Sequence, residues 1–115
     1  MPSDGRLRKI VDALHHTPSD RATTGEWARR IGMSERALFR LVLKQTGMSF
    51  GRWRQQIQVM LAIEQLSKGK AVQAIAFDLG YESASAFITM FKKAMGQPPA
   101  TYLATRQGRG KTRHT

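Results

Sequence analysis

The apolar residues of this chain recur at intervals of three and four, the spacing that places side chains on one face of an α-helix. The first stripe is Leu7, Ile10, Val11 and Leu14, at i, i+3, i+4 and i+7. No segment alternates apolar and polar residues with β-branched enrichment, so the sequence predicts no strand. We therefore expect an all-α fold of about seven helices.

Capping residues and glycines divide the chain into these helices. Thr23-Thr24-Gly25-Glu26 has the form of a capping box, so a helix is expected from about Thr23. The other expected starts are Ser3 or Asp4, Ser34, Ser49, Ser83 and Pro98-Pro99, and the expected stops are Thr17-Pro18-Ser19-Asp20, Gly32, Gly47, Lys68-Gly69-Lys70, Gly80 and Gly96. The side chains expected inward are Trp27, Ala28, Ile31, Leu38, Leu41, Val42, Phe50, Trp53, Ile57, Met60, Leu61, Leu66, Val72, Ile75, Ala76, Leu79, Phe87, Met90 and Phe91.

One two-helix unit occurs twice in the sequence. Ala28 and Gly32 match Ala76 and Gly80 at an offset of 48 residues, and the following apolar positions and the closing glycine match at an offset of 49, so one extra residue is expected in the second turn. The pattern predicts a helix-turn-helix, because the small alanine lets two helices cross closely and the glycine permits the sharp turn. The alternative is an ordinary αα-hairpin that binds no ligand.

The repeat defines the expected organisation of one domain over residues 5–106. Helix-turn-helix subdomains are expected at about 23–47 and 71–96, joined by a long linker helix at about 49–67. That linker would be roughly 28 Å long, against the roughly 34 Å between successive major grooves of DNA. Residues 107–115 contain no apolar side chain, and we expect a disordered basic tail there.

Charge suggests the partner. The chain has 19 Lys and Arg against 8 Asp and Glu, a formal net charge of +11, which favours a polyanion: nucleic acid first, an anionic membrane surface second. The stretches 36–63 and 83–115 are basic and contain no acidic residue, although solvated helix surfaces would give the same pattern.

Several function classes are excluded. Without cysteine there is no disulfide scaffold, thiol nucleophile or Cys-ligated metal, and the composition is consistent with a reducing cytoplasm. His15 and His16 point to different helix faces, and no histidine–carboxylate cluster has metal-ligand spacing. No nucleophile elbow, phosphate-binding glycine loop or apolar run of about 18 residues is present. We expect a protein that is not an enzyme, holds no cofactor or metal and spans no membrane.

The motif residues resemble the DNA-binding domain of the AraC/XylS family of bacterial transcriptional regulators, over about residues 5–106. The most specific stretch runs from Gly80-Tyr81-Glu82-Ser83-Ala84-Ser85-Ala86-Phe87 through Phe91-Lys92-Lys93-Ala94-Met95-Gly96 to Pro99 and Tyr102. The first unit is similar at Gly32-Met33-Ser34, Leu38, Arg40-Leu41 and Thr46-Gly47-Met48-Ser49-Phe50. The chain departs from the family at Leu103, where an arginine usually follows the tyrosine.

The resemblance implies a cytoplasmic protein with two helix-turn-helix subdomains and a rigid linker helix, which binds double-stranded promoter DNA and contacts RNA polymerase. Many members also carry an N-terminal effector domain. A chain of 115 residues has no room for one, so we expect either a short stand-alone regulator or a fragment of a longer one.

The first recognition helix offers side chains that can read bases. Arg36 and Arg40 lie at i and i+4, and arginine can bond guanine O6 and N7 together. We expect Arg40 to be the main reader and Arg36 to read or to hold a phosphate, although either could be a solvated surface residue. Phe39 could touch a thymine methyl group or pack on the linker helix. Glu35 could accept from cytosine N4, but the positive N-terminus of its helix is the more expected partner.

The second recognition helix offers short groups. Ser85 and Thr89 can bond bases or phosphates, and Ala84 can only make apolar contacts, so we expect the first unit to specify the sequence and the second to anchor and read shape. The predicted DNA-binding residues are Ser34, Arg36, Ala37, Arg40, Lys44, Ser83, Ala84, Ser85, Thr89, Lys92 and Lys93.

A sequence-specific regulator of transcription is therefore the leading hypothesis. A non-specific architectural DNA-binding protein is the alternative, which the basic tail favours. A protein-interaction module, with charge serving solubility, is a third class.

Overall fold

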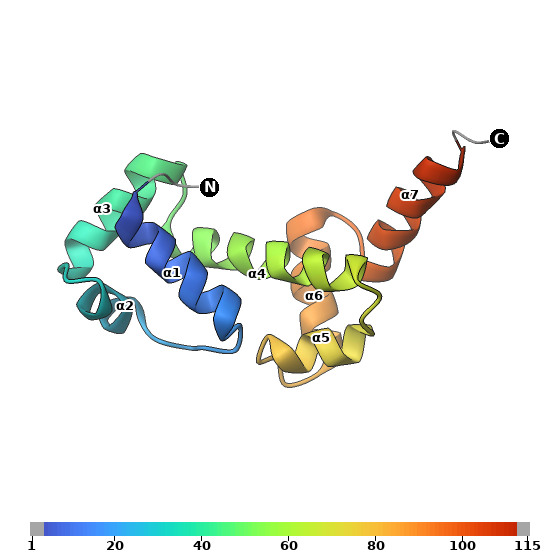
Figure 1. Cartoon of the computed structure of the whole chain (residues 1–115), viewed down its shortest axis with the longest axis horizontal. Coiled ribbons are helices and arrows are strands. Elements are labelled where there is room, and N and C mark those ends of the chain that lie inside the picture. Colours follow the sequence, from blue (N-terminus) through green and yellow to red (C-terminus); the bar gives the residue numbers. More distant parts are fainter. Residues whose placement is uncertain (1–3, 113–115) are drawn as a thin grey trace. The chain divides into compact units, whose positions relative to one another are not determined.

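The computed structural model describes residues 4–112, with side chains described for 4–105. Over this range it contains seven α-helices and no strand (Figure 1), which confirms the expected all-α fold. The helices are α1 (Gly5–His16), α2 (Thr24–Arg30), α3 (Glu35–Thr46), α4 (Phe50–Ser67), α5 (Val72–Asp78), α6 (Ala84–Met95) and α7 (Pro99–Thr112).

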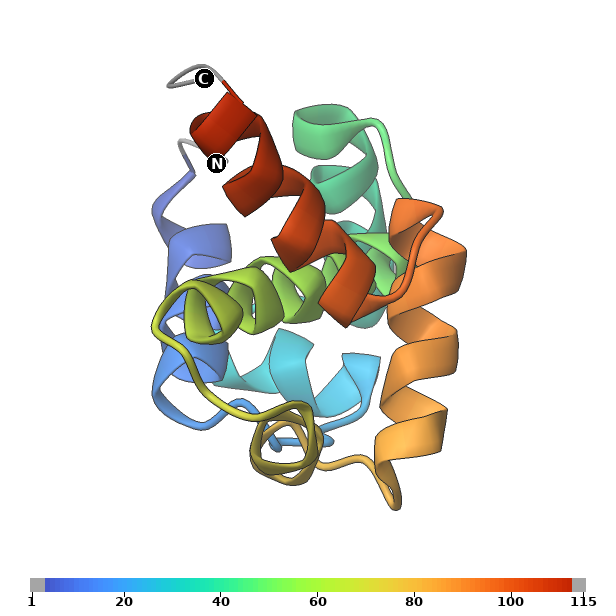
Figure 2. The same ribbon diagram turned by 90° about the vertical axis from the view of Figure 1, so that its right-hand side faces the viewer.

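The chain forms two compact units, Met1–Gln58 and Val59–Thr115. The first comprises α1, α2, α3 and the beginning of α4, and the second comprises the rest of α4 with α5, α6 and α7. Within the units, α2 contacts α3, α5 contacts α6, and α6 contacts α7. Figure 2 shows α5 end-on, with α6 upright beside it.

Most helix starts coincide with the predicted caps. The Asp4 carboxylate accepts a hydrogen bond from the Arg6 backbone N–H at 2.8 Å, and the Ser49 hydroxyl accepts one from the Arg52 N–H at 3.3 Å. The capping box is complete, since the Glu26 N–H donates to Thr23 Oγ1 at 3.2 Å and the Thr23 N–H donates to Glu26 Oε1 at 3.0 Å. α5 begins differently, because its N-cap is Ala71 and no side chain caps it.

The two helix-turn-helix turns have the same backbone hydrogen bond at the same place. The Met33 N–H donates to the Ala28 carbonyl at 2.9 Å, and the Tyr81 N–H donates to the Ala76 carbonyl at 2.9 Å. Gly32 and Gly80, which precede these donors, have φ of 73° and 84°, a left-handed conformation that glycine adopts without strain. The connection is 31–34 in the first unit and 79–83 in the second, so the predicted extra residue is present.

Each unit has its own set of buried side chains. In the first unit they are Leu7, Ile10, Leu14, Ala22, Trp27, Ala28, Leu38, Val42, Phe50, Trp53 and Ile57. In the second they are Val59, Leu61, Ala62, Leu66, Ile75, Ala76, Leu79, Phe87, Phe91 and Pro99. Several side chains that we expected inward are only partly buried: Val11, Ile31, Leu41, Val72 and Met90.

The prediction for Met60 was wrong, because its side chain is 47% exposed. The buried residues of α4 do not form a single apolar stripe. The helix has two, Phe50, Trp53, Ile57 and Leu61 on one face and Val59, Ala62 and Leu66 on another. The face that is buried therefore changes along α4, and Met60, three residues after Ile57 and seven after Trp53, continues the first stripe beyond the part of it that is buried.

The end of the chain also differs from its prediction. α7 continues to Thr112, so residues 107–112, which we expected in a disordered tail, are helical. Once a helix has begun, each further residue adds one hydrogen bond, and no proline follows Pro99 to stop it. Residues 113–115 of the predicted tail lie outside the described residues.

Candidate nucleic-acid interface

Caps and buried contacts fix α3 within the first unit. The Ser34 hydroxyl accepts a hydrogen bond from the Ala37 N–H at 3.1 Å, and the helix ends at Gly47, which has φ of 73°. Leu38 and Val42 are completely buried. These contacts determine which face of α3 is left exposed.

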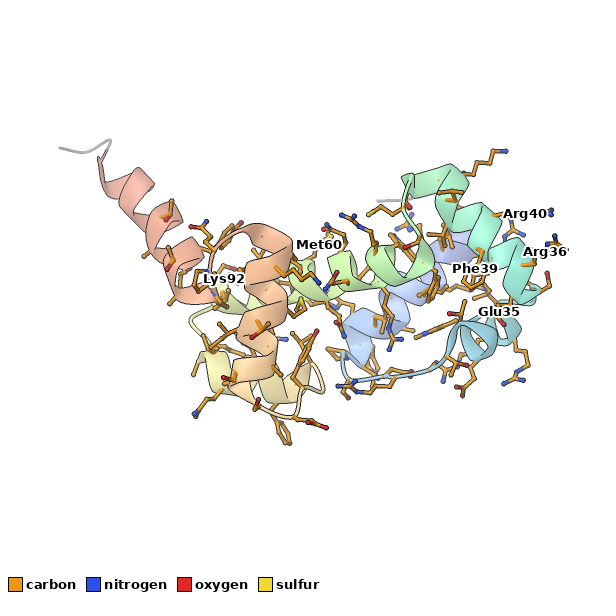
Figure 3. All side chains as sticks on the ribbon, turned by 180° about the vertical axis from the view of Figure 1, so that it is seen from behind. Glu35, Arg36, Phe39, Arg40, Met60 and Lys92 are labelled. Carbon is orange, nitrogen blue, oxygen red and sulfur yellow. The ribbon has the colours of Figure 1, made fainter. Side chains whose placement is uncertain are left out.

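Four side chains make a continuous exposed row on α3, which we call the α3 stripe. They are Arg36, Phe39, Arg40 and Leu43, at i, i+3, i+4 and i+7, all exposed, in contrast to Leu38 and Val42, and Phe39 lies at the edge of the row nearest Val42. Figure 3 shows Arg36 and Arg40 projecting outward from the helix. Phe39 is 46% exposed and Leu43 is 59% exposed, so neither is a core residue.

The cations of α3 are available to a ligand. Neither Arg36 nor Arg40 has an ion-pair or hydrogen-bond partner among the described residues, and both are exposed. Lys44 is exposed one turn beyond Arg40. A forked guanidinium without an internal partner can bond two acceptors of one anion or one guanine.

Other cations nearby are used within the protein. Arg30 pairs with Asp20 at 2.9 Å and its guanidinium lies 4.6 Å from the centre of the Trp27 ring. The hydrogen bond from Arg30 lowers the pKa of the Asp20 carboxyl below its usual value. Arg54 donates to the backbone carbonyls of Ala22, at 3.1 Å, and Asp20, at 2.6 Å. Arg54, which we counted in a basic stretch, therefore holds the connection between α1 and α2.

Glu35 lies beside the first turn of α2. A Cβ added to Gly25 would lie 3.4 Å from Glu35 Oε2, and Figure 3 labels Glu35 near the start of α3. The free N–H groups of a helix start attract a carboxylate. This position favours an electrostatic interaction of the Glu35 carboxylate with helix N-termini over a contact with cytosine. The helix starts near the carboxylate are those of α2 and of α3 itself.

α6 repeats the framework of α3 with different exposed groups. The Ser83 hydroxyl accepts a hydrogen bond from the Ala86 N–H at 3.1 Å, and Phe87 and Phe91 are completely buried. The predicted contact residues Ser85, Thr89, Lys92 and Lys93 are all exposed, whereas Ala84, like Ala37 on α3, is partly buried. The structure thus groups the predicted residues into two sets, one on each recognition helix.

Leu43 and Phe77 are exposed apolar residues to which our sequence analysis assigned no role. Leu43 completes the α3 stripe, and its place one turn after Phe39 was the signal that would have identified it. Phe77, on α5, is 79% exposed. The buried residues of this region are Ile75, Ala76 and Leu79, and Phe77 is not at a position that shares their face. Its position in the sequence could therefore have identified it as an exposed apolar residue.

The described part of the chain shows neither a metal-binding cluster nor a membrane-spanning helix. Residues 4–112 contain no group of three or more histidine, aspartate or glutamate side chains arranged to hold a metal ion. Among the same residues, none of the helices combines the length and apolar character needed to cross a membrane.

Comparisons with known proteins identify similar domains. Residues 27–105 match the family model described as a helix-turn-helix domain. The HTH-type transcriptional regulator NimR of Escherichia coli K12 is 47% identical over 102 residues, which cover 89% of this chain and 37% of NimR. The HTH-type transcriptional regulator RipA of Corynebacterium glutamicum is 29% identical over 114 residues, covering 99% of this chain and 34% of RipA.

Solved structures give the same picture. The DNA-binding domain of AdpA, crystallised with a target DNA, matches with a TM-score of 0.75 and 27% identity, over 93% of this chain and 96% of that one. The C-terminal domain of AraT from Geobacillus stearothermophilus matches with a TM-score of 0.73 and 29% identity, over 89% and 86% of the two chains. The chain spans 37% and 34% of the lengths of NimR and RipA.

Proposed function

The chain belongs to the AraC-type family of helix-turn-helix domains, and we propose that it is a sequence-specific regulator of transcription that binds double-stranded promoter DNA. The observation that carries the proposal is the α3 stripe. It places two arginines without internal partners on the exposed face of a recognition helix that is capped at one end and anchored by Leu38 and Val42.

In this proposal α3 enters the major groove. Arg40, and Arg36 one turn before it, donate to guanine O6 and N7, while Lys44 holds a phosphate. Backbone N–H groups at the start of α3, behind Ser34, face the phosphates as other helix starts do. Ala37, beside them, gives only a methyl contact.

The second unit makes the weaker reading contacts. Ser85 and Thr89 offer one hydroxyl each, Ala84 an apolar contact, and Lys92 and Lys93 hold phosphates. The start of α6 behind Ser83 offers its backbone N–H groups. The absence of long polar side chains at positions 84, 85, 88 and 89 supports this division of roles.

The family resemblance extends the proposal to partners and location. We propose that the chain acts in the cytoplasm, contacts RNA polymerase and works with an effector domain that lies outside the described chain. NimR and RipA, named as transcriptional regulators, are each about three times as long as the region that matches, which is compatible with additional domains. Catalysis is no part of the proposal.

Selection from a pool of random DNA duplexes tests the proposal. We expect bound molecules to share a motif, and a non-cognate duplex in tenfold excess to compete poorly against it. The second candidate, a non-specific architectural protein, is favoured by the small exposed side chains of α6. It predicts that no motif is enriched and that every duplex competes equally well.

A further inference from the structure

The α3 stripe combines two kinds of side chain that rarely share one exposed helix face. Arg36 and Arg40 are cationic, and Phe39 and Leu43 are large and apolar, about half exposed in each case. A single exposed apolar residue is common on a protein surface. Two of them at i and i+4, interleaved with two arginines that have no partner among the described residues, match a ligand that offers both polar acceptors and an apolar group.

The major groove offers that combination. Guanine presents the O6 and N7 acceptors, and the C5-methyl group of thymine is the apolar group that the base edges carry there. We propose that Phe39 is a specificity-determining residue that recognises a thymine through this methyl group. The inference rests on the proposed function and adds to it the chemical identity of a second base.

Phe39 is better placed for this contact than Leu43. The N-terminal residues of a recognition helix are the ones that contact base edges, and Phe39 lies between Arg36 and Arg40 in the first half of α3. Leu43 follows one turn later, more than two turns from the capped start. Phe39 directly precedes Arg40, a separation of about 1.5 Å along the helix, against about 3.4 Å between base pairs. The thymine should therefore lie within about two base pairs of the guanine that Arg40 reads.

Deoxyuridine tests this contact, because it differs from thymine only by lacking the methyl group. The half-site tested is the one in which Arg40→Ala relaxes the base preference. Each thymidine of that half-site is replaced in turn by deoxyuridine, and the Kd of the full chain is measured for each duplex. We expect one replacement to weaken binding about fourfold, the factor that corresponds to burying one methyl group. In Phe39→Ala, which should bind the thymine site four- to tenfold more weakly (about 0.8–1.4 kcal/mol), the same replacement should have no further effect.

Two variants serve as controls. Phe39→Leu keeps an apolar side chain and should retain part of the sensitivity to deoxyuridine. Phe77→Ala removes an exposed phenylalanine from α5 and should leave both Kd values unchanged. Circular dichroism checks that Phe39→Ala keeps its helices.

Each other result overturns the proposal. A selected half-site without thymine, or one in which no replacement matters, shows that the methyl group is not read. Equal sensitivity to deoxyuridine in Phe39→Ala shows that another residue reads it. If Phe39→Ala weakens binding to selected and random DNA by the same factor, Phe39 contributes to the packing of α3. If Phe39→Ala leaves the affinity for DNA unchanged, the exposed ring serves a contact with a protein partner instead. A pool without any motif instead overturns the proposed function.

Discussion

The two helix-turn-helix units share a backbone framework and differ in what they present to a ligand. Ala28, Gly32 and Ser34 in the first unit correspond to Ala76, Gly80 and Ser83 in the second, with matching turn and cap hydrogen bonds. The exposed face of α3 carries arginines and large apolar groups, whereas that of α6 carries hydroxyls and lysines. A few buried residues, a capping serine and a glycine in the left-handed conformation are therefore common to both units, whereas the exposed positions differ and set the chemistry of each unit.

The units also differ in how they are held together. The first depends on polar contacts around α2: the capping box of Thr23 and Glu26, the Arg30–Asp20 pair and the hydrogen bonds of Arg54. In the second, α5 has no side-chain cap, and a row of aromatic rings runs from Tyr81 through Phe87 and Phe91 to Tyr102, with centroids 5.7–6.0 Å apart. Such ring pairs contribute about 0.5–1.5 kcal/mol each beyond the area they bury.

The largest expected effect is that of salt on the affinity of the whole chain. If the two units together neutralise about 6–8 phosphates, the log–log slope of affinity against salt should be about −5 to −7, or about 10³–10⁴-fold between 50 and 200 mM. A fluorescence-anisotropy titration measures it. Lys92→Ala should weaken binding to all DNA and reduce the slope by about one. A slope shallower than about −2 would rule out a phosphate-binding role for both units.

The next largest effect concerns the aromatic row of the second unit. Phe87 is completely buried between the rings of Tyr81 and Phe91, so Phe87→Ala should lower the free energy of unfolding by about 3–5 kcal/mol. Urea unfolding followed by circular dichroism measures the loss. The matched control, Phe77→Ala on α5, should change the free energy of unfolding by less than about 0.5 kcal/mol, because that ring is exposed. Similar losses in both variants would contradict the packing of the second unit described above.

Substitution of the residues proposed to contact bases should have a smaller effect on affinity, and it allows a direct comparison of the two units. Arg40→Ala should cost about 1–3 kcal/mol on the selected site and relax base preference at one or two positions, without affecting the fold. Thr89→Ala should cost less, because a hydroxyl makes one weak bond where a guanidinium makes two. Repeating the site selection with each variant tests this asymmetry. It is wrong if Thr89→Ala relaxes the motif more than Arg40→Ala, or if neither changes it.

The framework of both units could be predicted from the sequence because each of its parts has a local cause. A glycine with positive φ, a serine before a helix and a buried residue every third or fourth position act within a few residues of one another. Both turns, including the extra residue of the second, were predicted for this reason.

Features that depend on contacts between distant residues could not be predicted in this way. Met60 is exposed because the buried face changes along α4, and Arg54 binds carbonyls more than 30 residues away. The α3 stripe was predicted in part: Arg36 and Arg40 were assigned, Phe39 had two alternatives, and Leu43 was missed because leucine is usually a core residue.

The smallest expected effect concerns α2 and α5, the first helices of the two helix-turn-helix units. Only α2 has a side chain that caps its start. Ala71, the N-cap of α5, is exposed and extended, with φ of −69° and ψ of 145°, close to the conformation of the capping residue Thr23. Ala71→Ser should therefore supply an acceptor for the N–H of Gln73 or Ala74 and raise the free energy of unfolding by about 0.5–1 kcal/mol. Thr23→Ala should lower it by about 1 kcal/mol, since it removes one hydrogen bond of the capping box. Thermal unfolding of the two variants and the parent chain measures both changes. If Ala71→Ser lowers the midpoint, the start of α5 lacks the space or the orientation for a capping side chain, and the missing cap reflects the geometry of the second unit rather than the identity of one residue.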